Sequence, residues 1–139
     1  MALTVFVTGC GPFAIGPGAA DFSAKLCGDY YVHRISAHQI QVSPMSWNRD
    51  TPIIPTKVVE LGHNQRFIVA KQNHLKRRSP DNLQDTYMEP NPGVFSYWIL
   101  DVSAPKAYGP MTEDEFWPQR KALGVPDVLT MKNVYSYRK

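Results

Sequence analysis

Hydrophobic and polar positions alternate along this chain in short stretches separated by turn-forming residues, a pattern typical of β-strands. Two such stretches, 30–35 and 38–43, predict a first hairpin. Residues 57–61 and 66–72 predict a second hairpin. In its second arm the run 67–70 is apolar on both faces, so we expect this strand in the middle of a sheet.

Residues 95–101 (Phe-Ser-Tyr-Trp-Ile-Leu-Asp) are also apolar on both faces and predict a second central strand, which must be covered on both sides. A helix that follows Pro110 is the expected cover on one side. Thr112 is a favourable N-cap, and Glu115, three residues later, completes a capping box. Pro118 is expected to kink this helix, because proline cannot donate to the carbonyl four residues earlier.

These elements predict an α+β fold: a mainly antiparallel β-sheet of about five to six strands, a meander of hairpins, covered by one C-terminal helix. A chain of 139 residues that is 43% hydrophobic suits a single core. Twelve prolines and nine glycines favour short strands and turns. We divide the chain into an N-terminal segment 1–9, a tether 10–29, a β-rich domain 30–132 and a tail 133–139.

The N-terminal residues resemble the end of a lipoprotein signal peptide. Val7, Thr8 and Gly9 lead into Cys10 as a lipobox does, so that Cys10 would become the lipidated N-terminus and segment 1–9 a remnant of the signal. The preceding apolar run is shorter than a usual signal core, and the alternative is an ordinary N-terminal strand.

Cys27 is the second of two cysteines. If Cys10 is lipidated, Cys27 is an unpaired thiol. If it is not, the two cysteines could form a disulfide in an oxidising compartment. The sequence leaves both arrangements open.

The charge pattern has one notable feature, a basic run that enters a long segment expected to be a loop from Asn73 to Pro92. The net charge of +3 is too small for a dedicated nucleic-acid binder, and no aromatic residues interleave with the cations, so we expect no nucleic-acid partner. Acidic residues follow the basic run and could neutralise it. A tryptophan in the polar loop 44–55 is expected to tuck under the edge of the sheet, and the alternative is that it is offered to a partner. The candidate partner-binding residues are Lys71, His74, Lys76, Arg77, Arg78 and Trp47.

No pattern predicts catalytic residues, a metal site or a cofactor. The four histidines, at 33, 38, 63 and 74, fall on separate turns and strands, without a nucleophile elbow, a zinc motif or an acid pair at a telling spacing. A cleft that united Cys27 with His63 or His74 and an acid would favour an enzyme instead.

Four segments together carry a family resemblance: Lys57-Val-Val-Glu-Leu, Arg66-Phe-Ile-Val-Ala-Lys-Gln, Tyr97-Trp-Ile-Leu-Asp and Tyr108-Gly-Pro. They resemble an uncharacterised family of small bacterial lipoproteins that carry a compact β-rich domain of unknown function. The resemblance implies a location in the cell envelope, with the domain facing the periplasm or the cell exterior. It implies no activity, and the only functional residue it transfers is Cys10.

We therefore expect a lipid-anchored, non-catalytic binding protein whose partner is a protein, either a toxin that it neutralises as an immunity or inhibitor protein, or an envelope component. Its contact with the membrane would be the lipid on Cys10. The alternative is a structural or accessory envelope protein, and a small hydrolase is the third hypothesis.

Overall fold

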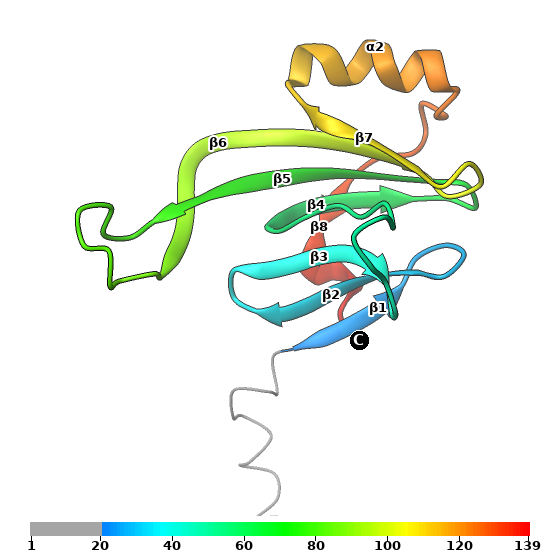
Figure 1. Ribbon diagram of the computed structural model, residues 1–139. Coiled ribbons are helices and arrows are strands. Elements are labelled where there is room, and N and C mark those ends of the chain that lie inside the picture. Colours follow the sequence, from blue (N-terminus) through cyan, green and yellow to red (C-terminus); the bar gives the residue numbers. More distant parts are fainter. Residues whose placement is uncertain (1–20) are drawn as a thin grey trace, which may run out of the picture.

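The computed structural model describes residues 21–139, which form two antiparallel sheets (Figure 1). The smaller sheet has the strand order β1-β2-β3 and the larger sheet the order β7-β6-β5-β4-β8. The elements are β1 (Phe22–Lys25), β2 (Tyr30–Ser36), β3 (Gln39–Pro44), β4 (Val58–His63), β5 (Phe67–Arg77), β6 (Met88–Asp101), β7 (Lys106–Met111), α2 (Glu113–Leu123), β8 (Lys132–Asn133) and the 3-10 helix η2 (Val134–Tyr137).

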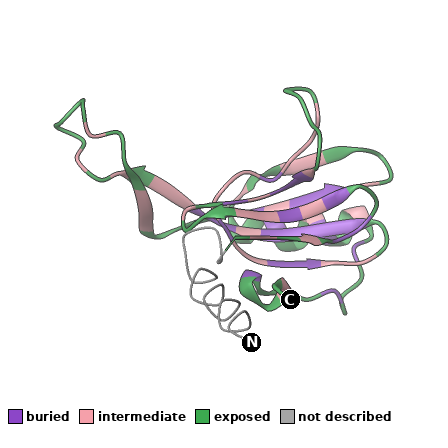
Figure 2. Cartoon of the chain, turned by 90° about the horizontal axis from the view of Figure 1, so that it is seen from below, coloured by how far each residue is buried: buried purple, intermediate pink, exposed green. Residues whose placement is uncertain are grey.

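The domain has three layers, because both faces of the larger sheet are covered. One face packs on the smaller sheet around a core that includes Val32, Ile40, Ile68 and Leu100. The other face packs on α2, where the fully buried Phe116 contacts the sheet. The apolar residues on both faces of β5 and β6 therefore have partners, as the sequence predicted. Figure 2 shows the buried residues concentrated in the strands.

The predicted fold class is confirmed: the chain is β-rich and antiparallel, with one α-helix in the described range. The strands number eight rather than five to six and divide into two sheets. β1 lies in the segment 10–29 predicted to be a tether, and Leu26 and Cys27 after it are buried. The segment 133–139 is likewise packed, since Val134 is buried and the Tyr137 hydroxyl donates to the carbonyl of Leu61 at 2.9 Å.

The first hairpin differs in register from the pairing that the predicted stretches 30–35 and 38–43 imply. His33 pairs with Gln41, and Arg34 pairs with Ile40. The turn lies one residue later than expected, because β2 continues to Ser36. A bulge between Arg34 and Ser36 absorbs the shift and keeps Ile40 in the core.

Helix α2 begins where the sequence predicted. The Thr112 hydroxyl accepts from the Glu115 amide at 3.2 Å, and the Glu115 carboxylate accepts from the Thr112 amide at 2.9 Å. The helix continues through Pro118 to Leu123 without a break. Pro118 is exposed, and its missing N–H removes one backbone hydrogen bond from the helix.

The segment expected to be a long loop consists of a two-stranded extension of the β5–β6 hairpin and the loop 78–87 at its tip, and it projects from the domain (Figure 1). We call residues 74–94 the arm, because they lie beyond the last regular pair, Asn73 with Phe95. Leu75 then pairs with Pro90, so residues 91–94 bulge out of the ladder. Prolines fit here because a two-stranded ribbon leaves one side of each strand without a partner.

Candidate partner-binding arm

The two arginines of the predicted basic run hold the tip of the arm. The guanidinium of Arg77 donates to the carbonyls of Asn82 and Asp85, each at 2.9 Å. Arg78 makes two hydrogen bonds of 3.0 Å to the carboxylate of Asp85 and lies over the ring of Tyr87, 4.6 Å from its centre. Both guanidinium groups therefore hold the tip loop closed and do not form a basic surface for a partner.

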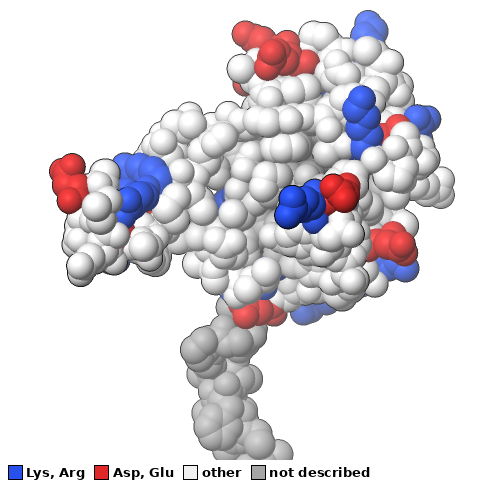
Figure 3. Space-filling view, viewed as in Figure 1, with Lys and Arg blue, Asp and Glu red and all other residues white. Residues whose placement is uncertain are grey.

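The carboxylate of Asp85 is correspondingly stabilised in its charged form. The hydrogen bond from Arg78 is the main reason that the pKa of Asp85 is lowered to about 2. The same carboxylate accepts from the amide of Tyr87 at 3.1 Å, and the amide of Arg78 donates to the carbonyl of Tyr87 at 2.9 Å. The basic and acidic groups of the arm therefore neutralise one another, and Figure 3 shows both signs of charge on its surface.

The other predicted cations occupy different environments. Lys71 lies on β5 below the arm, with its ammonium 4.3 Å from the ring centre of Phe95 and 3.9 Å from the carboxylate of Glu60. The ring of His74 is 2.6 Å from the hydroxyl of Ser96 and is partly buried. Lys76 is exposed on the arm. The predicted basic run is thus brought together along one strand but does not form a continuous positive patch.

Trp47 lies apart from the basic run, on the connection after β3. Its side chain is 46% exposed and is therefore not tucked under the sheet as expected; it lines a hollow of about 260 Å³ together with Ile35 and Met45. Both neighbours are exposed hydrophobic residues. The candidate residues predicted from the sequence therefore belong to two separate surfaces.

The arm exposes apolar side chains that the sequence reasoning did not select. Leu83 is 80% exposed at the tip, and Tyr87, Met88 and Val94 are also exposed. Phe95 extends this surface at the base of the arm. The signal was present in the sequence as isolated apolar residues between prolines and charges, but only the paired strands place them on one projection.

A groove of about 350 Å³ separates the arm from the turn between β2 and β3. Tyr87 and Met88 line it from the arm, and His38 lines it from the turn. The rings of His38 and Tyr87 meet edge to face at 5.8 Å, and Nδ1 of His38 is buried without a hydrogen-bond partner among the described residues. The groove thus combines the apolar side chains of Tyr87 and Met88 with polar residues of the turn, and the unpaired nitrogen of His38 lies buried behind this lining.

The base of the arm is held by a buried side chain. The amide nitrogen of the Asn73 side chain donates to the carbonyls of Asn91 and Val94, at 2.9 and 3.1 Å. Both carbonyls belong to the bulge, so Asn73 replaces the ladder hydrogen bonds that the bulge interrupts. The arm is therefore fixed at both its base and its tip.

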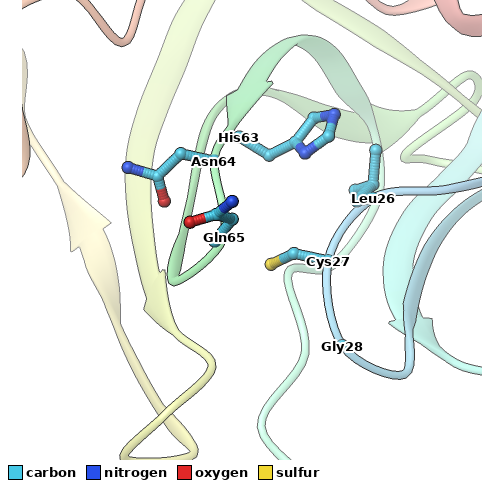
Figure 4. Close-up of a pocket in the computed structure, with 6 residues that line it drawn as sticks. All are labelled: Leu26, Cys27, Gly28, His63, Asn64 and Gln65. Atoms are coloured by element: carbon cyan, nitrogen blue, oxygen red, sulfur yellow. The ribbon is translucent and has the colours of Figure 1, made fainter.

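A second hollow brings together two residues that the sequence treated as separate. Cys27 and His63 line one cavity of about 500 Å³ with Leu26, Gly28, Asn64 and Gln65 (Figure 4). Cys27 is a buried free cysteine, and burial raises the pKa of its thiol. Burial also lowers the pKa of His63. Because no acid among residues 21–139 lines the cavity and the thiol favours its protonated form, the described residues do not provide the activation that a cysteine nucleophile needs.

Residues 21–139 contain no group of three or more residues of the metal-binding types close enough to hold an ion. In the same range no helix has the length and apolar character required to cross a membrane. Cys10, the predicted lipidation site, lies outside the described residues, as does the segment 1–9.

The comparison with protein families gives one match, to a family described as "Protein of unknown function (DUF3997)", over residues 27–135. This match covers most of the chain, including the arm, the larger sheet, strands β2 and β3 of the smaller sheet, and α2, but not β1. The chain belongs to this family. This confirms the prediction that the chain carries a domain of unknown function. Comparison with curated proteins and with solved structures gives no match.

Proposed function

We propose that this DUF3997 protein is a non-catalytic binding protein whose arm contacts a partner protein. One observation carries the proposal: the arginines of the arm are used to hold its tip, while Leu83, Tyr87, Met88 and Val94 remain exposed. A projection that is held in shape by its own charges and that presents apolar side chains matches what a protein interface requires.

The energetics favour binding by apolar contacts over binding by charge. Burial of a large apolar side chain is worth on the order of 1.5–3 kcal/mol, whereas an exposed ion pair contributes about 0–1 kcal/mol. Tyrosine is also among the residues that most often dominate interface energies. Because hydrogen bonds of Asn73, Arg77 and Arg78 already order the arm, little conformational entropy would be lost on binding.

We further propose that the domain acts in the bacterial cell envelope, anchored by a lipid on Cys10, and that the partner is a toxin or an envelope component. The lipobox-like residues before Cys10 support the anchor. Metabolic labelling with a palmitate analogue tests it. We expect label on the wild-type protein and none on Cys10→Ala; equal labelling of both proteins would exclude this cysteine as the anchor.

Site-specific photo-cross-linking in the producing cells tests the role of the arm. Benzoylphenylalanine at position 83 is compared with the same group at position 128, since Leu83 and Val128 are 80% and 87% exposed and differ mainly in location. We expect a discrete cross-linked product with a second protein from position 83 and none from position 128.

A second variant tests whether the contact made at position 83 depends on the apolar side chains of the arm. Tyr87→Asp in the position-83 background should abolish the cross-link without changing the circular dichroism spectrum of the protein. Cross-links of equal yield from positions 83 and 128, or a cross-link from 83 that is indifferent to Tyr87→Asp, would contradict the proposal.

A further inference from the structure

The smaller sheet has an edge strand, β1, that pairs on one side only among the described residues. In the order β1-β2-β3, strand β1 pairs on one side with β2, and the described residues provide no strand on its other side. The opposite edge, β3, is closed: Val42 and Ile54 exchange two backbone hydrogen bonds of 3.0 Å, and the amide of Ile40 donates to the Thr56 hydroxyl at 2.9 Å. An unpaired edge is a template for another extended segment.

A groove runs along this free edge. It has a volume of about 650 Å³ and is lined by all four residues of β1. Successive side chains of a strand point to opposite faces, so a hollow that contacts every residue of β1 follows the edge of the strand and not one of its faces. The C-terminal residues Ser136, Tyr137 and Lys139 form the opposite wall, and Figure 1 shows the C-terminus beside β1.

The groove continues past the end of β1. His63 lines it and also lines the cavity formed by residues 26–28, so the two hollows adjoin at this histidine. Nδ1 of His63 is buried and has no hydrogen-bond partner among the described residues. Together the hollows border the chain from residue 22 to residue 28. Because β1 ends at Lys25 and the chain then turns towards β2, the strand edge suits an extended segment of about four residues at roughly 3.3 Å each.

The charges along the groove favour an acidic occupant. Lys25 and Lys139 line it, and the charge of Lys132 acts on His63. Asp21, at the start of β1, is paired with Arg34 at 2.9 Å. The apolar part of the wall comes from Phe22 and Tyr137, which pack against the core.

From these observations we propose that the groove binds an extended acidic segment of a partner protein, which adds to β1 as a fourth strand of the smaller sheet. Its apolar side chains contact Phe22 and Tyr137, and its alternate acidic side chains face Lys25 and Lys139. This site is distinct from the arm, and neither proposal depends on the other.

Selection from a phage-displayed library of linear seven-residue peptides against the immobilised full chain tests the inference. We expect enrichment of peptides that alternate apolar and acidic residues. The consensus peptide, synthesised with a fluorescent label, is then titrated by fluorescence polarisation. Lys25→Glu should weaken its binding about tenfold or more, while Lys106→Glu, an exposed lysine on the edge strand β7, should leave the affinity unchanged.

The backbone contacts are tested with the wild-type protein, which avoids any effect on folding. Two versions of the consensus peptide carry N-methyl groups on alternate residues. In the first version the methyl groups block one edge of the extended peptide, and in the second version they block the other edge. We expect one version to lose about tenfold or more in affinity and the other to bind as the parent does, because only one edge pairs with β1. Absence of enriched peptides, equal affinity for wild type and Lys25→Glu, or equal tolerance of both methylated versions would overturn the inference.

Discussion

The carboxylate of Asp101 should make the stability of this domain depend on pH in acid. Asp101 is 3% exposed at the end of β6. Its carboxylate accepts from Nε and Nη2 of Arg66 at 3.2 and 2.9 Å and from the hydroxyl of Ser103 at 2.8 Å. These donors, Arg66 first, outweigh the effect of burial and lower the pKa of Asp101 from its ordinary 3.8 to about 2.

A pKa lowered by this amount corresponds to about 2 kcal/mol of free energy of unfolding, since one pKa unit is worth about 1.4 kcal/mol. Because the pKa is lower in the folded state, the contribution is complete above pH 3.8 and is lost as the pH falls towards 2. Urea denaturation followed by tryptophan fluorescence at several pH values measures it.

We expect Asp101→Asn to be less stable than wild type at pH 6 and the difference to shrink by about 2 kcal/mol on acidification to pH 2, because asparagine cannot titrate. The control is Asp81→Asn, which changes an exposed carboxylate on the arm. A difference between wild type and Asp101→Asn that stays constant over this range would refute the reasoning.

Three further substitutions test the packing of the fold by urea denaturation. Gly62→Ala should cost about 1–3 kcal/mol, because a Cβ at this position would overlap the carbonyl oxygen of Thr130; wild-type stability would contradict that close approach. Phe116→Ala should cost about 3–5 kcal/mol, because Phe116 is fully buried. Trp117 is half exposed, so Trp117→Ala should cost under about 1 kcal/mol. Equal losses of stability in the two variants would contradict the packing of this face of α2 on the sheet. Thr112→Ala should lower the free energy of unfolding by about 1 kcal/mol, because the N-cap hydrogen bond is lost. Thr112→Ser keeps the hydroxyl and should be as stable as wild type.

Local sequence signals predicted the elements whose causes are local. The capping box of Thr112 and Glu115 acts within one turn, so it located the start of α2 without any knowledge of the sheet. The apolar faces of residues 67–70 predicted a central strand for the same reason, since the alternation of side chains is a property of the strand itself. Pro118 does not divide the helix into two segments, since α2 continues through this residue to Leu123.

The missed features depend on partners distant in sequence. Prolines between residues 80 and 92 indicated a loop, but the pairing of β5 with β6 up to Arg77 and Met88 confines the loop to the tip of a paired arm. β1 has only four residues, and its strand character depends on pairing with β2. No periodicity in so short a stretch distinguishes it from a linker.

The amino-acid sequence alone determined the fold class, the central strands and the first turn of the helix, because hydrophobic alternation and end-capping act over a few residues. Only the tertiary structure decided where the side chains of the candidate surfaces point and which of them are exposed. The direction of the Arg77 and Arg78 side chains, the exposure of Leu83 and Tyr87, and the groove beside β1 all depend on strand register and on which edge remains unpaired. Those properties arise from contacts between separate segments, as the pairing of Arg66 with Asp101 does across the β5–β6 hairpin.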